Sequence, residues 1–191
     1  MAIIIPADLT IVTLRRGDLE LPQRWTAEHA VAVLRHASDL LKAHANFESP
    51  LGTCEQVVET MPSGGASDAV DEAGYDFLAA TYKAGDGIRV LLVDRVVEAE
   101  LGAQSRQQTR VCVLAHGSDI GATSRTLAHE IGHLLALPHV DNGRRPEHAP
   151  DAQTWTRNLM YSGPLSRSPQ LTPTQVQAAR SSPLARRFGG R

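Results

Sequence analysis

The segment Thr126–Asp141, TLAHEIGHLLALPHVD, restricts the fold of this chain more than any other segment. Its apolar residues recur with the period of a helix, so one face of that helix must pack against a core. His129 and His133 are four residues apart and lie on one helix face, about one turn apart. His139 comes too far along for the same face. The chain must therefore bend just after Leu135 if the third imidazole is to join the first two.

The polar residues of this segment have the spacing of a zinc site. Two histidines at positions i and i+4 can offer ring nitrogens to one tetrahedral zinc ion at roughly 2.0 to 2.1 Å. Glu130 directly follows the first histidine, where its carboxylate can lie over the open position of the metal and take a proton from water. The spacing predicts one catalytic zinc ion, with His129 and His133 as ligands and Glu130 as the general base.

Length and composition exclude several classes of protein. With 191 residues, 42% of them apolar, the chain is long enough for one domain, or for one domain cut by a cleft. A net charge of -2 gives no attraction to nucleic acid or to an anionic membrane. The N-terminal residues lack the basic region of a signal peptide, and no stretch approaches the roughly 18 apolar residues of a membrane span. We expect a monomer that is cytoplasmic or exported by a leaderless route, for example as a secreted effector.

Other potential ligands are scattered. Cys54 and Cys112 are too few for a disulfide scaffold and have no C-x-x-C spacing, so we expect two buried thiols, with a single bridge between them left open. The remaining histidines have no acidic or cysteine partner at a chelating spacing and are expected on the surface. They are His29, His36, His44, His116 and His148.

The rest of the chain alternates extended segments with amphipathic helices, which predicts an α+β or α/β layered domain around a central sheet. Strands are predicted at 9–16, 55–61, 87–97 and 109–117. A long helix is predicted from the N-cap Thr26, and a second helical segment at 69–85, ending near Gly85. A last helix, LTPTQVQAAR, has Thr172 as N-cap, Pro173 at its first position and Gln175 completing a capping box.

The spacing of the three histidines resembles the signature of the metzincin clan of zinc metallopeptidases, H-E-x-x-H-x-x-G-x-x-H. A tight turn that contains methionine follows downstream in that clan, and RNLMYSG at 157–163 is similar to it, with Met160 as the turn methionine. The resemblance implies His139 as the third zinc ligand. Asp141, Glu147 and Asp151 stay open as alternatives.

The same resemblance implies a single catalytic domain over 1–191 with a metzincin-like α+β fold. A twisted, mostly parallel sheet with an antiparallel edge strand, a long backing helix and the active-site helix would form an N-terminal subdomain, 1–139. A small C-terminal subdomain, 140–191, would hold the methionine turn and the last helix. The segment VCVLAHG at 111–117 would be the edge strand that lines the cleft and pairs with an extended peptide.

Two positions depart from the clan. Ala136 stands where the clan has glycine, and a left-handed backbone there would cost roughly 1 to 2 kcal/mol. Tyr161 directly follows Met160, whereas some metzincin branches place a tyrosine two residues after the methionine. Tyr161 is therefore either a transition-state or cleft residue or a packing residue. Met160 would underlie the ligand imidazoles without touching substrate.

The resemblance implies a zinc-dependent endopeptidase that acts on an extended polypeptide. Glu130 would take a proton from the attacking water and return it to the leaving amine. One alternative is a zinc peptidase or amidase on bacterial cell-wall peptides. A second is a non-catalytic, zinc-stabilised binding module, against which Glu130 argues because a structural zinc site needs no general base. A separate inhibitor or immunity protein is a further expected partner.

Overall fold

The computed structural model describes residues 2–61, 69–97, 103–106, 108–141, 155–163, 165 and 169–189. Its strands are β1 (Ile3–Ile4), β2 (Ala7–Arg16), β3 (Leu19–Glu20), β4 (Phe47–Glu48), β5 (Leu51–Thr60), β6 (Ile88–Val93), β7 (Ala103–Arg106) and β8 (Val111–Ala115). Its helices are α1 (Ala27–Ala45), α2 (Glu72–Thr81), α3 (Ile120–Leu134), α5 (Pro173–Arg180) and α6 (Pro183–Gly189). None of these helices is long and apolar enough to cross a membrane.

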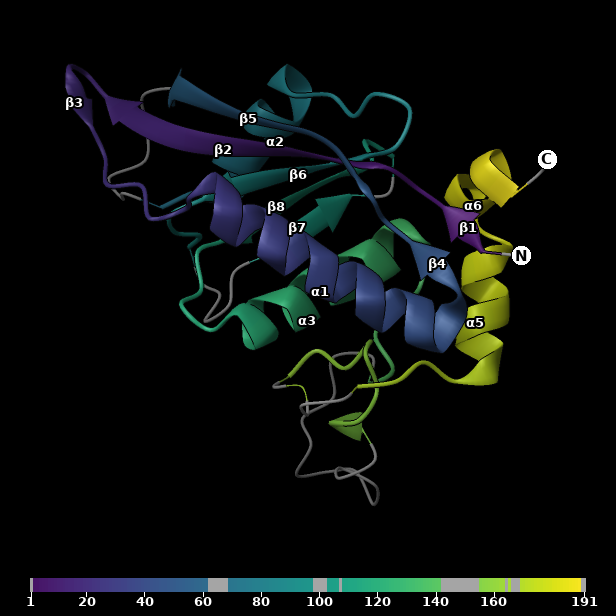
Figure 1. Ribbon diagram of the computed structural model, residues 1–191. Coiled ribbons are helices and arrows are strands. Elements are labelled where there is room, and N and C mark those ends of the chain that lie inside the picture. Colours follow the sequence, from purple (N-terminus) through teal and green to yellow (C-terminus); the bar gives the residue numbers. More distant parts are fainter. Residues whose placement is uncertain are drawn as a thin grey trace.

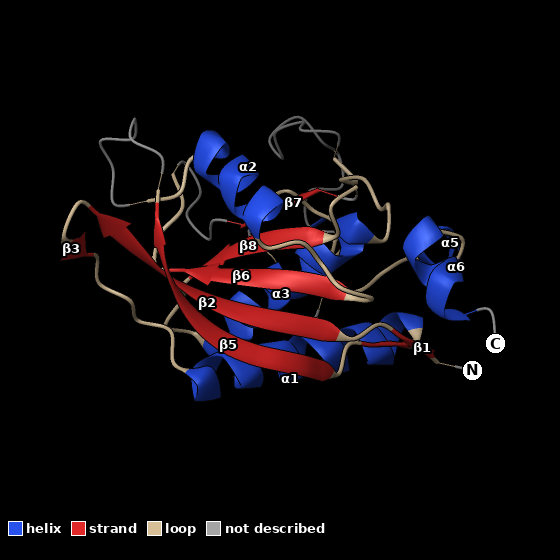
Figure 2. Cartoon of the chain, turned by 90° about the horizontal axis from the view of Figure 1, so that it is seen from above, coloured by secondary structure: helices blue, strands red, loops and turns tan. Residues whose placement is uncertain are grey.

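A twisted sheet of six strands forms the centre of the molecule (Figures 1 and 2). Strand β2 pairs in parallel with β5 on one side and with β6 on the other, and β8 follows β6, also in parallel. Strand β7 joins β8 antiparallel at the edge, and the short β3 pairs antiparallel with the end of β2. The fold is a mixed α+β fold, as predicted, with a mostly parallel sheet.

Helices cover both faces of this sheet. Figure 2 shows α2 on one face, with α1 and α3 on the other. The residues of β2 alternate between the two layers: Leu9 and Ile11 belong to the core cluster under α1 and α3, while Val12 and Leu14 belong to the cluster under α2. This period of two is why a strand buried on both faces has an almost continuous apolar sequence.

Helix ends follow the signals in the sequence. The Thr26 side chain caps α1 by accepting from His29 N, and Asn46 ends that helix in a left-handed conformation with φ 58°. At α5, Thr172 and Gln175 form the predicted capping box, with a proline in the first turn. Both N-terminal boundaries are therefore confirmed.

The predicted edge strand is wrong. The segment at 111–117 contains β8, which lies inside the sheet between β6 and β7. The edge is β7, in a segment between two predicted strands where no strand is predicted. In addition, α2 ends at Thr81 rather than near Gly85, and β5 begins at Leu51 rather than at position 55. The division into subdomains at residue 139 stays a prediction.

Candidate metal centre

Helix α3 carries two of the three histidines on a rigid element. Its N-cap is Asp119, whose side chain accepts from Ala122 N at 2.8 Å. The apolar face that packs beneath the sheet is buried and consists of Leu127, Ala128, Ile131 and Leu134. His129 and His133, one turn apart, leave the same helix beside that face. Core packing thus fixes the backbone from which both imidazoles extend.

The helix ends in the bend that His139 requires. Ala136 has φ 65°, which is the left-handed conformation. Leu137 N donates to Gly132 O at 3.0 Å and Ala136 N donates to His133 O at 2.9 Å. These two bonds form a Schellman motif, which normally has glycine at the position of Ala136. The chain reverses there and returns toward the helix.

The bend brings three imidazoles together. The Nε2 atoms of His129, His133 and His139 lie 2.9 to 3.1 Å from one another. His129 Nδ1 donates to Leu159 O at 2.6 Å, and His133 Nδ1 donates to Leu137 O at 2.8 Å. A neutral imidazole has one N–H, so the Nε2 atoms of these two rings present lone pairs to each other. Lone pairs that converge in this way repel unless a cation, or an N–H donated by the His139 ring, lies between them.

Burial favours the neutral form of these rings. It lowers the pKa of His129 to about 4, although the bond to Leu159 O opposes the shift. Burial also lowers the pKa of His133. Neutral imidazole is the form that binds a metal, and burial keeps both rings in that form.

The three nitrogens fit a zinc ion. A tetrahedral zinc ion with ligands at about 2.0 to 2.1 Å needs ligand atoms about 3.3 Å apart. The observed separations of 2.9 to 3.1 Å are only slightly shorter. Among the described residues, these three histidines form the group of potential ligand side chains that lie close enough together to hold a metal ion. Three nitrogen ligands leave a position open, which is typical of a catalytic zinc site rather than a structural one.

Glu130 lies next to the first of these histidines and is 7% exposed. The pKa of the Cys112 thiol on β8 is raised, mainly by burial and secondly by the charge of the Glu130 carboxylate. Cys112 and Cys54 are both free, so no bridge joins them. Cys112 is buried as predicted, whereas Cys54 is only partly buried.

The turn at 158–160 packs under the histidines. Met160 is fully buried, and a Cβ added to Gly132 would clash with Met160 Sδ. Glycine at this helix position thus allows the methionine to lie directly against the helix between His129 and His133. Tyr161 is 3% exposed, with its ring 6.2 Å from that of Trp155.

The alternative ligands fall in two groups. Asp141 is buried, and its carboxylate accepts hydrogen bonds from Ser162 Oγ and from Ser162 N, the latter at 3.4 Å. Val140 N donates to Met160 O at 3.0 Å, so the residues after His139 are fastened to the turn. Asp141 therefore joins the loop after His139 to the loop that contains Ser162. Glu147, Asp151 and His148 lie outside the described residues.

Two other histidines, which were expected on the surface, are partly buried. His29 and His116 are half-buried and pack edge-to-face, with ring centroids 5.0 Å apart, and both contact Trp25. Burial lowers the pKa of His116, with a further contribution from Arg24.

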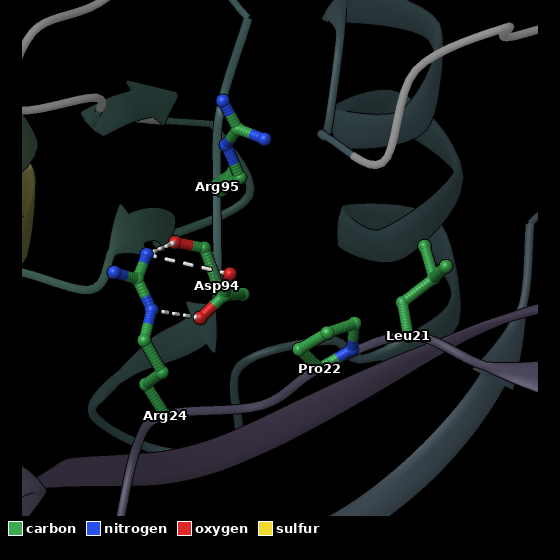
Figure 3. A pocket seen from close by; sticks show the side chains of 5 residues that line it. All are labelled: Leu21, Pro22, Arg24, Asp94 and Arg95. Carbon is green, nitrogen blue, oxygen red and sulfur yellow. Dashed lines mark hydrogen bonds and ion pairs between the residues drawn. The ribbon is translucent and has the colours of Figure 1, made fainter.

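A pocket that includes Arg24 is lined by Leu21, Pro22, Arg24, Asp94 and Arg95 (Figure 3). Arg24 is already paired there, since its Nε donates to Asp94 at 2.7 Å.

The strained alanine gives a testable prediction. We expect Ala136→Gly to raise the free energy of unfolding by about 1 kcal/mol, because glycine adopts φ 65° without a Cβ clash. For a chain of this size that corresponds to a melting temperature about 2 to 4 °C higher. The measurement is thermal unfolding of the metal-free protein. As control, Ala178→Gly on the exposed side of α5 is expected to lower stability by about 0.5 to 1 kcal/mol. Destabilisation by both changes would contradict the strain.

No protein-family profile matches this chain, and no curated protein sequence matches it. Its fold is similar to a solved structure, the crystal structure of archaemetzincin from Methanopyrus kandleri. The TM-score is 0.57 and the identity is 14%, over 92% of this chain and 93% of that chain. The similarity is one of fold and spans nearly the whole length of both chains.

Proposed function

We propose that this protein is a zinc-dependent endopeptidase. The observation that carries the proposal is the convergence of three imidazole nitrogens within 3.1 Å of one another, with Glu130 adjacent in the same helix. The fold similarity to archaemetzincin supports it, because the sequence resembles the metzincin signature at these same residues. His129, His133 and His139 would hold the ion.

The residues around the ion have separate roles in this proposal. Zinc held by these three neutral imidazoles would supply Lewis acidity, which would lower the pKa of water and polarise a carbonyl. Glu130 accepts a proton from the attacking water and returns it to the leaving amine. Its burial beside an apolar strand keeps the carboxylate away from bulk solvent. Met160 does not react and packs under the ligand rings.

The substrate in this proposal is an extended polypeptide. Strand β7 is at the edge of the sheet, and its described neighbour is β8 on one side only. It also lies against α3, the helix of the histidines. An extended segment can add to such an edge through main-chain hydrogen bonds, which places a scissile bond without demanding a particular sequence.

A cleavage assay with two substrate classes tests this function. We expect the zinc-loaded protein to produce new N-termini from a mixture of unfolded proteins, detected by mass spectrometry, and a chelator to abolish them. Purified bacterial cell wall is the parallel substrate. Release of wall peptides without cleavage of the unfolded proteins would favour the amidase alternative. Zinc binding with neither activity would favour the binding module.

A further inference from the structure

The side chain of Gln175 has partners in two elements. Within the capping box of α5, Gln175 Oε1 accepts from Thr172 N at 2.9 Å. The same amide faces Asn158 in the turn below the histidines. Asn158 Nδ2 donates to Gln175 Oε1 at 2.9 Å, and Gln175 Nε2 donates to Asn158 Oδ1 at 3.1 Å. The two amides therefore form a reciprocal pair that joins α5 to the turn.

Asn158 passes this link to the turn backbone. Its Oδ1 also accepts from Met160 N at 2.9 Å, which closes the backbone around Leu159. Leu159 N donates to Gln170 O at 2.8 Å. Leu159 O, held between these bonds, is the acceptor for His129 Nδ1 at 2.6 Å. A short series of hydrogen bonds thus connects the cap of α5 to a metal-ligand ring.

The carbonyl partner of a ligand histidine controls that ligand. By accepting from Nδ1 it fixes the tautomer and the ring orientation, so that the Nε2 lone pair points at the ion. Loss of such a partner typically weakens metal affinity by about 10 to 100-fold. The position of Leu159 O depends on the turn, and the turn depends on the Asn158 amide.

We propose that Gln175 and Asn158 are positioning residues for His129, acting through Leu159 O. The proposal rests on the proposed zinc site. It gives Gln175 two roles, because the same side chain completes the N-terminal cap of α5 and helps to orient a metal ligand.

Two variants separate these roles. Gln175→Glu keeps an oxygen that accepts from Thr172 N, so the cap is retained. It removes the N–H group that donates to Asn158 Oδ1 and places two acceptors opposite each other. Thr172→Ala does the reverse, since it deletes the hydroxyl that accepts from Gln175 N at 3.2 Å and leaves the amide pair in place.

Zinc affinity is measured by competition with a chromophoric chelator. We expect Gln175→Glu to weaken binding by about 10-fold, the lower end of the effect of losing a direct partner, because Leu159 O is displaced rather than removed. Thr172→Ala should change affinity less than about threefold while lowering the melting temperature. The double variant Gln175→Glu, Asn158→Ser should bind zinc no more weakly than Gln175→Glu alone, because both changes break the same pair of amide hydrogen bonds. Should Gln175→Glu fail to fold, Asn158→Ser by itself carries the same expectation.

A second readout does not need zinc. Nitrogen NMR of the metal-free protein reports the tautomer of His129, which we expect to be Nδ1–H in the wild type and mixed in Gln175→Glu. If the wild type binds no zinc, the proposed function fails, and the NMR result still tests the link. If the wild type binds zinc and Gln175→Glu matches it in affinity and tautomer, the link is wrong.

Discussion

Replacement of Glu130 by glutamine is expected to lower peptide hydrolysis by about two or more orders of magnitude. Glutamine has nearly the same size as glutamate but cannot take a proton from water. The three histidines are untouched, so zinc content should stay at about one ion per chain. The measurements are the rate of cleavage of an unfolded protein and the metal content of the same sample.

A matched carboxylate serves as control for this change. Glu28, in the first turn of α1, is exposed and belongs to another element. Glu28→Gln removes the same charge and is expected to leave hydrolysis unaltered. Hydrolysis at the wild-type rate in Glu130→Gln would mean that another residue takes the proton.

Loss of a histidine is expected to act on the metal itself. In the folded protein His139 lies as close to His133 as His129 does, with Nε2 atoms 2.9 and 3.0 Å apart. We therefore expect His139→Ala to weaken zinc binding by more than about 100-fold, beyond the usual effect of an outer partner. Equilibrium competition with a chelator measures this directly.

The comparison variants for His139 are His36→Ala and Asp141→Asn. His36 is exposed on α1 and should have no effect on zinc. Asp141 is bonded to Ser162 and should have a smaller effect than His139. A large loss in Asp141→Asn together with wild-type affinity in His139→Ala would assign the third ligand to the carboxylate.

Features that depend on neighbours in sequence were predictable. The period of α3 excludes His139 from the helix face, so a bend after Leu135 follows from geometry, and Ala136 has the φ of 65° that such a bend uses. The capping box of Thr172 and Gln175 was predictable for the same reason, since its partners are three residues apart.

The edge strand was not predictable from local pattern. Strand β7, AQSR, has no apolar alternation and therefore no pattern typical of a strand. It is a strand because its backbone pairs with β8, and that partner lies on the far side of a turn. The apolar run of β8 was correctly predicted as a strand, but an apolar sequence indicates burial on both faces and hence a place inside the sheet.

Contacts between distant residues were also beyond prediction. His29 and His116 are 87 positions apart, and only the packing of α1 near the end of β8 brings their rings together. The bond from Ser162 to Asp141 and the pairing of Gln175 with Asn158 depend in the same way on how loops dock. Residue type alone leaves the partner of such a side chain undetermined.

The bond between His129 and Leu159 has a consequence for the time at which the proposed metal centre forms. The two residues are 30 positions apart. At about 5 to 20 residues per second, the ribosome makes Leu159 about 1.5 to 6 s after His129. During that interval the nascent chain comes to contain all three histidines, but not yet the Leu159 carbonyl that accepts from His129 Nδ1 in the folded protein. We therefore expect high-affinity binding of the proposed zinc ion to belong to the last stage of synthesis, and a pause between codons 139 and 159 to prolong a state that binds metal weakly.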